Sequence, residues 1–340
     1  MATITTAWTQ IHPSFVEPGI LLSYNQASGA FNALATGNPI VKIGSEDLAV
    51  YIKHLDIRTK MAAGQAAYNS LPSVTIVGDT ASTPTYLQRV RAEYDHHDTA
   101  SMAMWGTSIV EAQRLGMRQG HFQLLRNSLL YGMNPTNGEG LLYANGATSI
   151  NLPPDFNGNT TVVTYDNGQM ATFLIQLISA TKTRTMQLGI PRRFVILGPQ
   201  RVLGAFEYQN IVQLTSYQRP GAGSTSTAGV VKDVLNWNGD EVLWCYDDTL
   251  IGQGAGGNDA VLVVMPEVEK PRGPMWNTNE FAEVQPGLAA CTLMYSDMAA
   301  PMEIPTPLAG GAIDVLSELR ATPGWAIRPE SVTICSMQYS

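Results

Sequence analysis

The sequence predicts an α+β fold in which strands and one long helix precede an alternating α/β region. Between residues 98 and 132, apolar residues recur at spacings of three and four, which is typical of an amphipathic helix. Polar and apolar residues alternate at 53–58 and 86–94, a pattern that predicts two half-buried strands. Strand-like and helix-like segments then alternate over residues 160–268. We therefore expect two parts of different architecture.

The composition excludes several classes of protein. The chain has 340 residues, of which 44% are hydrophobic and 14% are charged, with a net charge of −8. The apolar fraction can supply a core and excludes a disordered chain. The acidic balance excludes a basic nucleic-acid binder. The charged fraction is well below the usual ~25%, which indicates either a poorly solvated surface or one that copies of the same chain cover.

Cysteine use and apolar run length point to an intracellular protein. Cys245, Cys291 and Cys335 form no C-x-x-C pair, so neither a zinc site nor a redox motif is predicted, and we expect three buried thiols. The first basic residue is Lys42, and no signal-peptide core precedes it. The longest apolar runs, such as 260–265, are far shorter than the ~20 residues that span a bilayer. We therefore expect a soluble protein.

The N-terminal segments indicate extended structure. Residues 1–41 hold one charged residue, Glu17, and many apolar ones. We expect an arm that packs on its own body or on a neighbour, with ordinary irregular packing as the alternative. Strands 53–58 and 86–94 flank a turn-rich segment and predict a long hairpin. Because isolated hairpins are marginal in water, we expect this one to lie against something else.

The long helix has recognisable ends. Asp98 is the expected N-cap, and Gly132 is expected to end the helix. Glycines at positions 106, 116 and 120 weaken the helix interior and predict a bend or the close crossing of another backbone.

The α/β region predicts a helix at 169–184 and a turn at Gly198-Pro199, with Pro199 as the first residue of a helix that ends at Tyr208. Its predicted strands are 193–197, 241–246 and 260–265. The C-terminal segment shows a helix signal at 312–319 and a strand signal at 331–334.

No group of residues predicts catalysis. Asp95-His96-His97-Asp98 is the single acid–histidine cluster, but adjacent side chains point apart, so we interpret it as a capped strand–helix junction. Gly254–Gly257 lacks the helix and the acidic residue of a dinucleotide site and is expected to be a loop. Asp247-Asp248 is expected to cap a turn. We predict no enzyme and no catalytic, cofactor-binding or metal-binding residues.

The order of these elements resembles that of tailed-bacteriophage major capsid proteins of the Hong-Kong-97-like fold. Three segments of the sequence are similar to segments of that family. They are Gly140-Leu141-Leu142, the strand–proline–helix step at 194–203, and Gly324-Trp325 followed by Arg328-Pro329-Glu330.

The resemblance implies a division of the chain into five parts. These are an N-terminal arm (1–43), an extended β-hairpin loop (44–94), a peripheral domain with a spine helix (95–159), an α/β axial domain (160–268) and return strands of the peripheral domain (269–340).

The resemblance also implies a function. The chain would self-assemble in the host cytoplasm into pentamers and hexamers of an icosahedral head, and so become part of the virion. That shell would enclose double-stranded DNA without sequence-specific binding, with scaffolding, portal and decoration proteins as further partners and with no cofactor and no membrane. The alternatives are a non-viral nanocompartment shell of the same fold, another virion component such as a tail-tube protein, and an α/β enzyme with a site built from distant residues.

Overall fold

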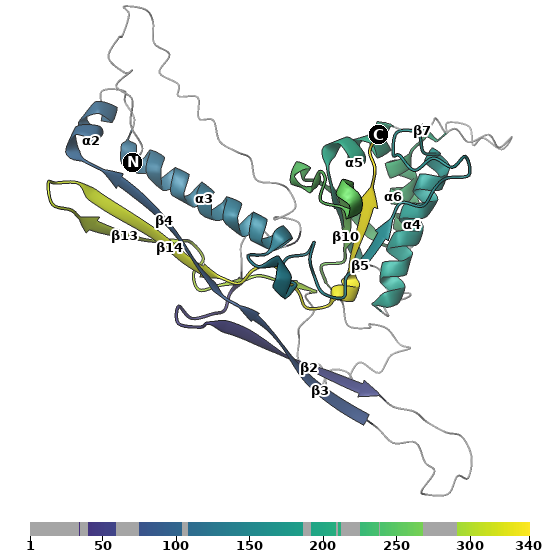
Figure 1. The fold of residues 1–340 in the computed structure, drawn as a ribbon, viewed down its shortest axis with the longest axis horizontal. Coiled ribbons are helices and arrows are strands. Elements are labelled where there is room, and N and C mark those ends of the chain that lie inside the picture. The colour runs from purple at the N-terminus through teal and green to yellow at the C-terminus, as the bar shows by residue number, and fades with distance from the viewer. Residues whose placement is uncertain are drawn as a thin grey trace, which may run out of the picture.

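The structure is a computed structural model. It describes Leu34 and residues 40–58, 75–103, 108–185, 192–208, 210–211, 225–237, 239–267 and 291–340. An elongated lobe with a long sheet and a long helix stands beside an α/β lobe, and a hairpin extends away from both (Figure 1). Most of the expected arm, residues 1–43, lies outside the described residues, as does Gly106.

The elongated lobe is built on a five-stranded sheet. In this sheet β14 lies between β4 and β13 and is antiparallel to both, while β1 and β12 extend it at one end. The strands are β1 (Ile40–Val41), β4 (Tyr86–Tyr94), β12 (Tyr295–Ser296), β13 (Met302–Pro307) and β14 (Ile313–Ala321). The expected helix at 312–319 is therefore wrong, because this segment is a strand whose alternate residues are buried.

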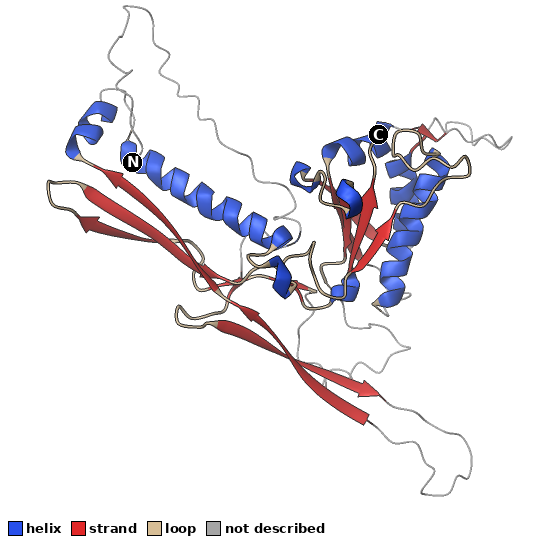
Figure 2. Ribbon diagram, viewed as in Figure 1, coloured by secondary structure: helices blue, strands red, loops and turns tan. Residues whose placement is uncertain are grey.

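The long helix of the sequence prediction is two helices, α2 (His96–Ala103) and α3 (Ile109–Tyr131). Ser108 starts the second helix, since its side chain accepts a hydrogen bond from the Glu111 amide. Helix α3 lies along one face of the sheet (Figure 2) and ends at Gly132, as expected. No atom approaches the positions that a Cβ would take at Gly116 and Gly120, so the predicted close crossing is wrong there.

The hairpin contains one of its two predicted strands, but that strand pairs with a different partner from the one predicted. Strand β2 (Ala49–Arg58) pairs with β3 (Thr75–Pro84), whereas the predicted partner, 86–94, is β4 and pairs with β14. Thr85 alone separates β3 from β4. The buried face of β4 finds its partners beneath α3, and this packing draws the strand out of the hairpin.

The α/β lobe contains a five-stranded sheet in the order β5-β16-β10-β6-β9, with β10 antiparallel to both its neighbours. The strands are β5 (Thr148–Asn151), β6 (Arg193–Gly198), β9 (Glu241–Tyr246), β10 (Asp259–Val264) and β16 (Val332–Met337). The helices are α4 (Asn167–Arg184), α5 (Gln200–Tyr208) and α6 (Thr227–Trp237). Within the predicted return segment, β13 and β14 thus join the long sheet and β16 joins this one.

Most local predictions in this lobe are confirmed. The helix predicted at 169–184 and the strands at 193–197, 241–246, 260–265 and 331–334 all form, within two or three residues. Pro199 precedes α5 instead of starting it, and its carbonyl accepts hydrogen bonds from the Val202 and Leu203 amides.

Short elements complete the described chain. They are β7 (Asn210–Ile211) with β8 (Thr225–Ser226), β11 (Thr292–Leu293) with β15 (Trp325–Ala326), and the 3₁₀ turns η2 (Pro135–Asn137), η3 (Asp248–Leu250), η4 (Ala255–Gly257) and η5 (Pro329–Ser331).

Two apolar cores cover opposite faces of the α/β sheet. Alternate strand residues such as Phe194 and Ile196 pack against α4, α5 and α6. Their neighbours Val195 and Leu197 pack against the end of α3 and against Leu319 of the long sheet. The second core therefore joins the two lobes.

Two of the segments quoted for the family resemblance meet at the C-terminal end of α3. The Gly140 amide donates to the Gly324 carbonyl at 2.7 Å, and the Gly324 amide donates to the Ser128 carbonyl at 3.0 Å. The Leu141 amide donates to the Leu129 carbonyl at 3.0 Å. The bond from Leu141 satisfies a carbonyl that the end of a helix otherwise leaves without a partner, while the Ser128 carbonyl also accepts from the Gly132 amide.

We predict that Gly324→Ala unfolds or strongly destabilises the chain. The new Cβ would lie 2.4 Å from the Leu129 carbonyl oxygen, a backbone atom that cannot move aside. We expect a loss of about 3 kcal/mol or more in the free energy of unfolding, measured by urea titration. The control is Gly120→Ala, where space is open and a helix interior favours alanine by about 0.5–1 kcal/mol. Equal stability of the two variants would contradict the prediction.

We also predict that His121 makes stability depend on pH. Its ring is 4% exposed between α3 and β14 and lies 3.1 Å from the Ser317 Oγ. Burial lowers the pKa of His121, and the hydrogen bond to Ser317 offsets this in part. The unfolded chain then binds more protons than the folded chain below about pH 6.5, so stability falls as the pH drops, by up to about 1.4 kcal/mol per pH unit. Urea titrations between pH 7.5 and 5 should show a weaker pH dependence of stability for His121→Gln than for wild type, and an equal dependence would contradict the prediction.

Candidate assembly surfaces

The outstretched hairpin is the largest candidate surface. At its root, Val50 and Ile52 pack against a small cluster formed by Ile43 and Tyr295. Tyr51, on the opposite face of β2, is 71% exposed. Further along, the hairpin extends away from both lobes (Figure 1).

Apolar side chains lie in water along this hairpin. Ile76 is 62% exposed, and Leu48 and Val77 are also exposed. A two-stranded ribbon is marginal alone, and covering an aliphatic or aromatic side chain of this size contributes about 1.5–3 kcal/mol. The hairpin is therefore a surface that a partner would stabilise.

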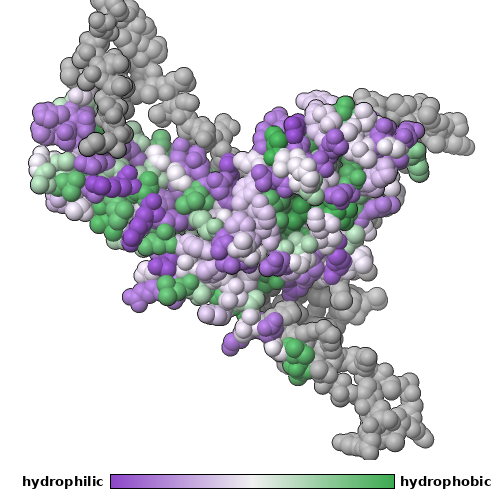
Figure 3. All heavy atoms as spheres, in the orientation of Figure 1, coloured by the Kyte–Doolittle hydropathy of each residue, from purple (hydrophilic) through white to green (hydrophobic). Residues whose placement is uncertain are grey.

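Three aromatic side chains project from the α/β lobe. Phe156 and Trp237 are 92% and 90% exposed, and Tyr208 is almost as exposed. Green apolar and purple polar residues are interspersed across the face seen in Figure 3, on both lobes. Aromatic side chains at such positions commonly anchor protein interfaces.

The turn that carries Phe156 is held by a buried carboxylate. Asp155 accepts hydrogen bonds from the Asn157 amide at 2.9 Å and from the Asn159 amide at 2.7 Å. Burial raises the pKa of Asp155, but the hydrogen bonds, first those from Asn159, outweigh it and lower the pKa overall. An ionised, fully used carboxylate fixes this turn and presents the phenyl ring to solvent.

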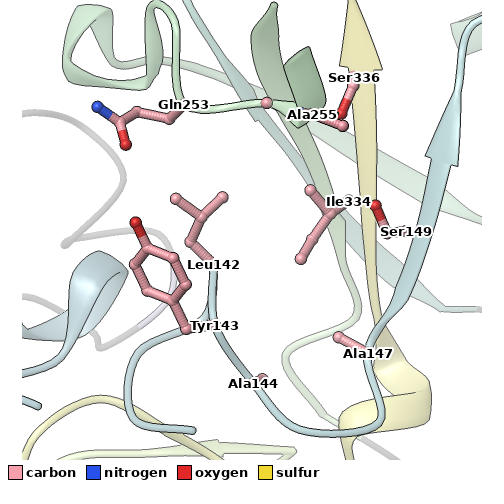
Figure 4. Close-up of a pocket in the computed structure, with 10 residues that line it drawn as sticks. Leu142, Tyr143, Ala144, Ala147, Ser149, Gln253, Ala255, Ile334 and Ser336 are labelled. Atoms are coloured by element: carbon pink, nitrogen blue, oxygen red, sulfur yellow. Dashed lines mark hydrogen bonds between the residues drawn. The ribbon is translucent and has the colours of Figure 1, made fainter. Parts of the chain in front are cut away.

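A cleft of about 380 Å³ lies between the segment after α3 and the edge of the α/β sheet. Leu142, Tyr143 and Gln253 lie on one side of it, and Ile334 and Ala147 lie on the other (Figure 4). No residue that lines it carries a charge. It is an uncharged recess of mixed polar and apolar lining, and its lining residues include no catalytic base.

The acid–histidine cluster is the predicted capped junction. The Asp98 amide donates to the Asp95 carboxylate at 2.8 Å, and the Asp95 amide donates to that of Asp98 at 3.2 Å. Asp95, and not the expected Asp98, is thus the N-cap, and it caps α2. The adjacent rings of His96 and His97 are in contact, with centroids 3.9 Å apart and planes tilted by 40°. In the described ranges, no three His, Cys, Asp or Glu side chains gather as a metal site would require.

The remaining candidate site residues also have structural roles. Asp247 accepts hydrogen bonds from both the amide and the hydroxyl of Thr249 and caps η3, as predicted. The glycine segment at 254–257 is the expected loop, which contains the turn η4, and the next element is strand β10. The acidic residue beside it, Asp259, is 1% exposed and is held by Arg201, so it cannot serve a ribose.

The three cysteines are free and buried, as predicted. Burial raises the pKa of Cys245, that of Cys291 to about 11 and that of Cys335 to about 12. At neutral pH these thiols stay protonated, and they are poor nucleophiles. None of the described helices combines the length and apolarity of a membrane-spanning segment.

The contacts at the hairpin root could not be predicted from the sequence. Thr85 and Arg320 meet there although 235 positions separate them in the chain. No periodicity or motif connects residues at that distance. The exposure of the three aromatic side chains could not be predicted either, because a pattern of residue types does not show which ring stays in water.

No family model and no curated protein matches the sequence significantly. Solved structures match it over nearly its whole length. For the capsid of Myoviridae phage XM1 the TM-score is 0.66 at 11% identity, with 95% of this chain and 96% of that chain covered.

Two further matches agree. The capsid structure of cyanophage P-SCSP1u has a TM-score of 0.55 at 11% identity, with 96% and 93% covered. A Gordonia phage Cozz structure has a TM-score of 0.55 at 13% identity, with 98% and 93% covered. The chain has a phage-capsid fold. The capsid fold predicted from the order of elements, α+β and of the Hong-Kong-97-like type, is thereby confirmed.

Proposed function

We propose that this chain is the major capsid protein of a tailed double-stranded DNA bacteriophage and that it self-assembles into an icosahedral head. One observation carries the proposal: a capsid fold covers 95% of the chain, and its longest hairpin lies outside the subunit's own body. Its role is structural and not catalytic.

The physical basis is the way that a shell closes. Rings of five and six copies need heterologous contacts, in which one surface of a subunit meets a different surface of the next. Obligate interfaces often bury more than about 2,000 Å² and are more apolar than free surfaces. A hairpin that reaches a neighbour buries Tyr51, Ile76 and Val77, and it accounts for a surface with so few charges.

The domains of the shell subunit follow the division that the resemblance implies. Residues 1–43 form the arm, 44–94 the extended loop, 95–159 and 269–340 the peripheral domain and 160–268 the axial domain. The pairing of strands refines two of these limits: β4 belongs with the peripheral sheet and β16 with the axial sheet.

The shell's contents and partners are part of the same proposal. The net charge of −8 suits a container whose wall lets DNA slide during packing and binds no particular sequence. Scaffolding, portal and decoration proteins complete the set of partners. The protein is assembled in the host cytoplasm and resides in the virion.

The test is assembly of the purified full-length chain, imaged by electron microscopy. We expect closed shells of one diameter. We expect the double variant Tyr51→Ser/Ile76→Ser to lower particle yield at least about tenfold, since two side chains lose about 1.5–3 kcal/mol of burial each. Its melting temperature before assembly should stay within about 2 °C of wild type, because both residues are exposed there.

The matched control is Val163→Ser, which removes an exposed aliphatic side chain outside the hairpin and should assemble normally. A wild-type chain that stays monomeric would contradict the proposal. Tubes would favour the tail-tube alternative, and closed shells that carry an enzyme cargo in place of DNA would favour the nanocompartment.

A further inference from the structure

The hairpin joins the body through both of its strands, and the connection on the β3 side is a single residue. Strands β3 and β4 run on from one another with Thr85 alone between them, and the pairing partner changes there from β2 to β14. Each hairpin strand has ten residues, so at about 3.3 Å per residue the described part of the hairpin is ~33 Å long. The contacts that hold Thr85 therefore influence the direction of the whole hairpin.

Arg320 binds both sides of this junction. Its Nη1 donates to the Thr85 Oγ1 at 3.1 Å and to the Asp47 carbonyl at 3.3 Å. The Thr85 hydroxyl donates in turn to the Asp47 carbonyl, and the Thr85 amide donates to the Leu48 carbonyl at 3.0 Å. One guanidinium therefore links the strand entering the hairpin to the strand leaving it.

The arginine is itself anchored to the body. Its amide donates to the Asp297 carboxylate at 3.1 Å, and its carbonyl accepts from the Asp297 amide at 3.0 Å. Arg320 also lies on β14, opposite Leu87 of β4. Because guanidinium is planar and offers several donors in a fixed arrangement, it defines an angle between its partners, which a flexible lysine does not.

We propose that Arg320 is a positioning residue that fixes the angle between the hairpin and the body, and through that angle the curvature of the shell. This rests on the proposed function. If the hairpin rotates by about 5° at its root, the end of its ~33 Å length moves by ~3 Å. A displacement of that size is a large mismatch for a packed contact. A subunit without this clamp forms contacts at several angles and so builds shells of several curvatures.

The experiment compares Arg320→Ala and Arg320→Lys with wild type. Hydrogen exchange of the unassembled chain is expected to be at least about tenfold faster at the Thr85 amide in Arg320→Ala, because its bond to Leu48 opens more often. Electron microscopy is expected to show loss of the single shell diameter, with mixed or open shells, and a smaller effect in Arg320→Lys.

Two further variants make the test specific. Thr85→Val removes the hydroxyl that accepts the Arg320 bond, at nearly constant volume, and should give the same mixed shells. Arg91→Ala is the matched control, since it removes an arginine from the same sheet whose 2.7 Å pair with Asp314 is exposed and away from the root. It should change neither exchange at Thr85 nor shell diameter.

The outcomes separate the two proposals. If Arg320→Ala forms shells of wild-type diameter, or folds yet forms no particles at all, the curvature role is overturned while the proposed function stands. Unchanged exchange at Thr85 overturns it too. If the wild type forms no particles, the proposed function fails, and curvature control fails with it.

Discussion

The structure depends on the backbone crossing at the C-terminal end of α3. There the last carbonyls of the helix are bound by the amides of Gly324 and of the segment that begins at Gly140. Only residues without a Cβ permit so close an approach. The crossing fixes the end of the helix against the long sheet, and the same helix end packs into the core that holds the α/β sheet. The two lobes therefore share one packed interior.

The rigidity of this junction shifts any change of shape to other places. A close-packed core has low compressibility and transmits strain instead of absorbing it. Among the described residues, the hairpin root has the fewest contacts for the length of chain that it holds. A small apolar cluster and a few hydrogen bonds attach the long hairpin there. The bonds of Arg320 therefore limit the range of angles that the hairpin can take relative to the body.

Local signals in the sequence were sufficient for much of the fold. The α/β lobe was predicted closely because each strand and helix carries its own period and turn residues. The segment at 312–319 misled because Val315, Leu316 and Leu319 also fit helical spacing, whereas strands β4 and β13 on either side of it decide its structure. The predicted pairing of the hairpin was wrong for the same reason, since an alternating pattern indicates a strand but does not indicate which strand pairs with it. The surfaces depend on contacts between distant segments, and the sequence could indicate them only through the low charge.

Strand β13 bounds the long sheet in a particular way. It pairs with β14, and Pro305 and Pro307 stand at alternate positions along it. Proline has no amide hydrogen to offer, so this border cannot accept a further strand in regular register. Lateral growth into a fibre is thereby blocked at this border, and a crowded population of newly made subunits is steered away from aggregation there.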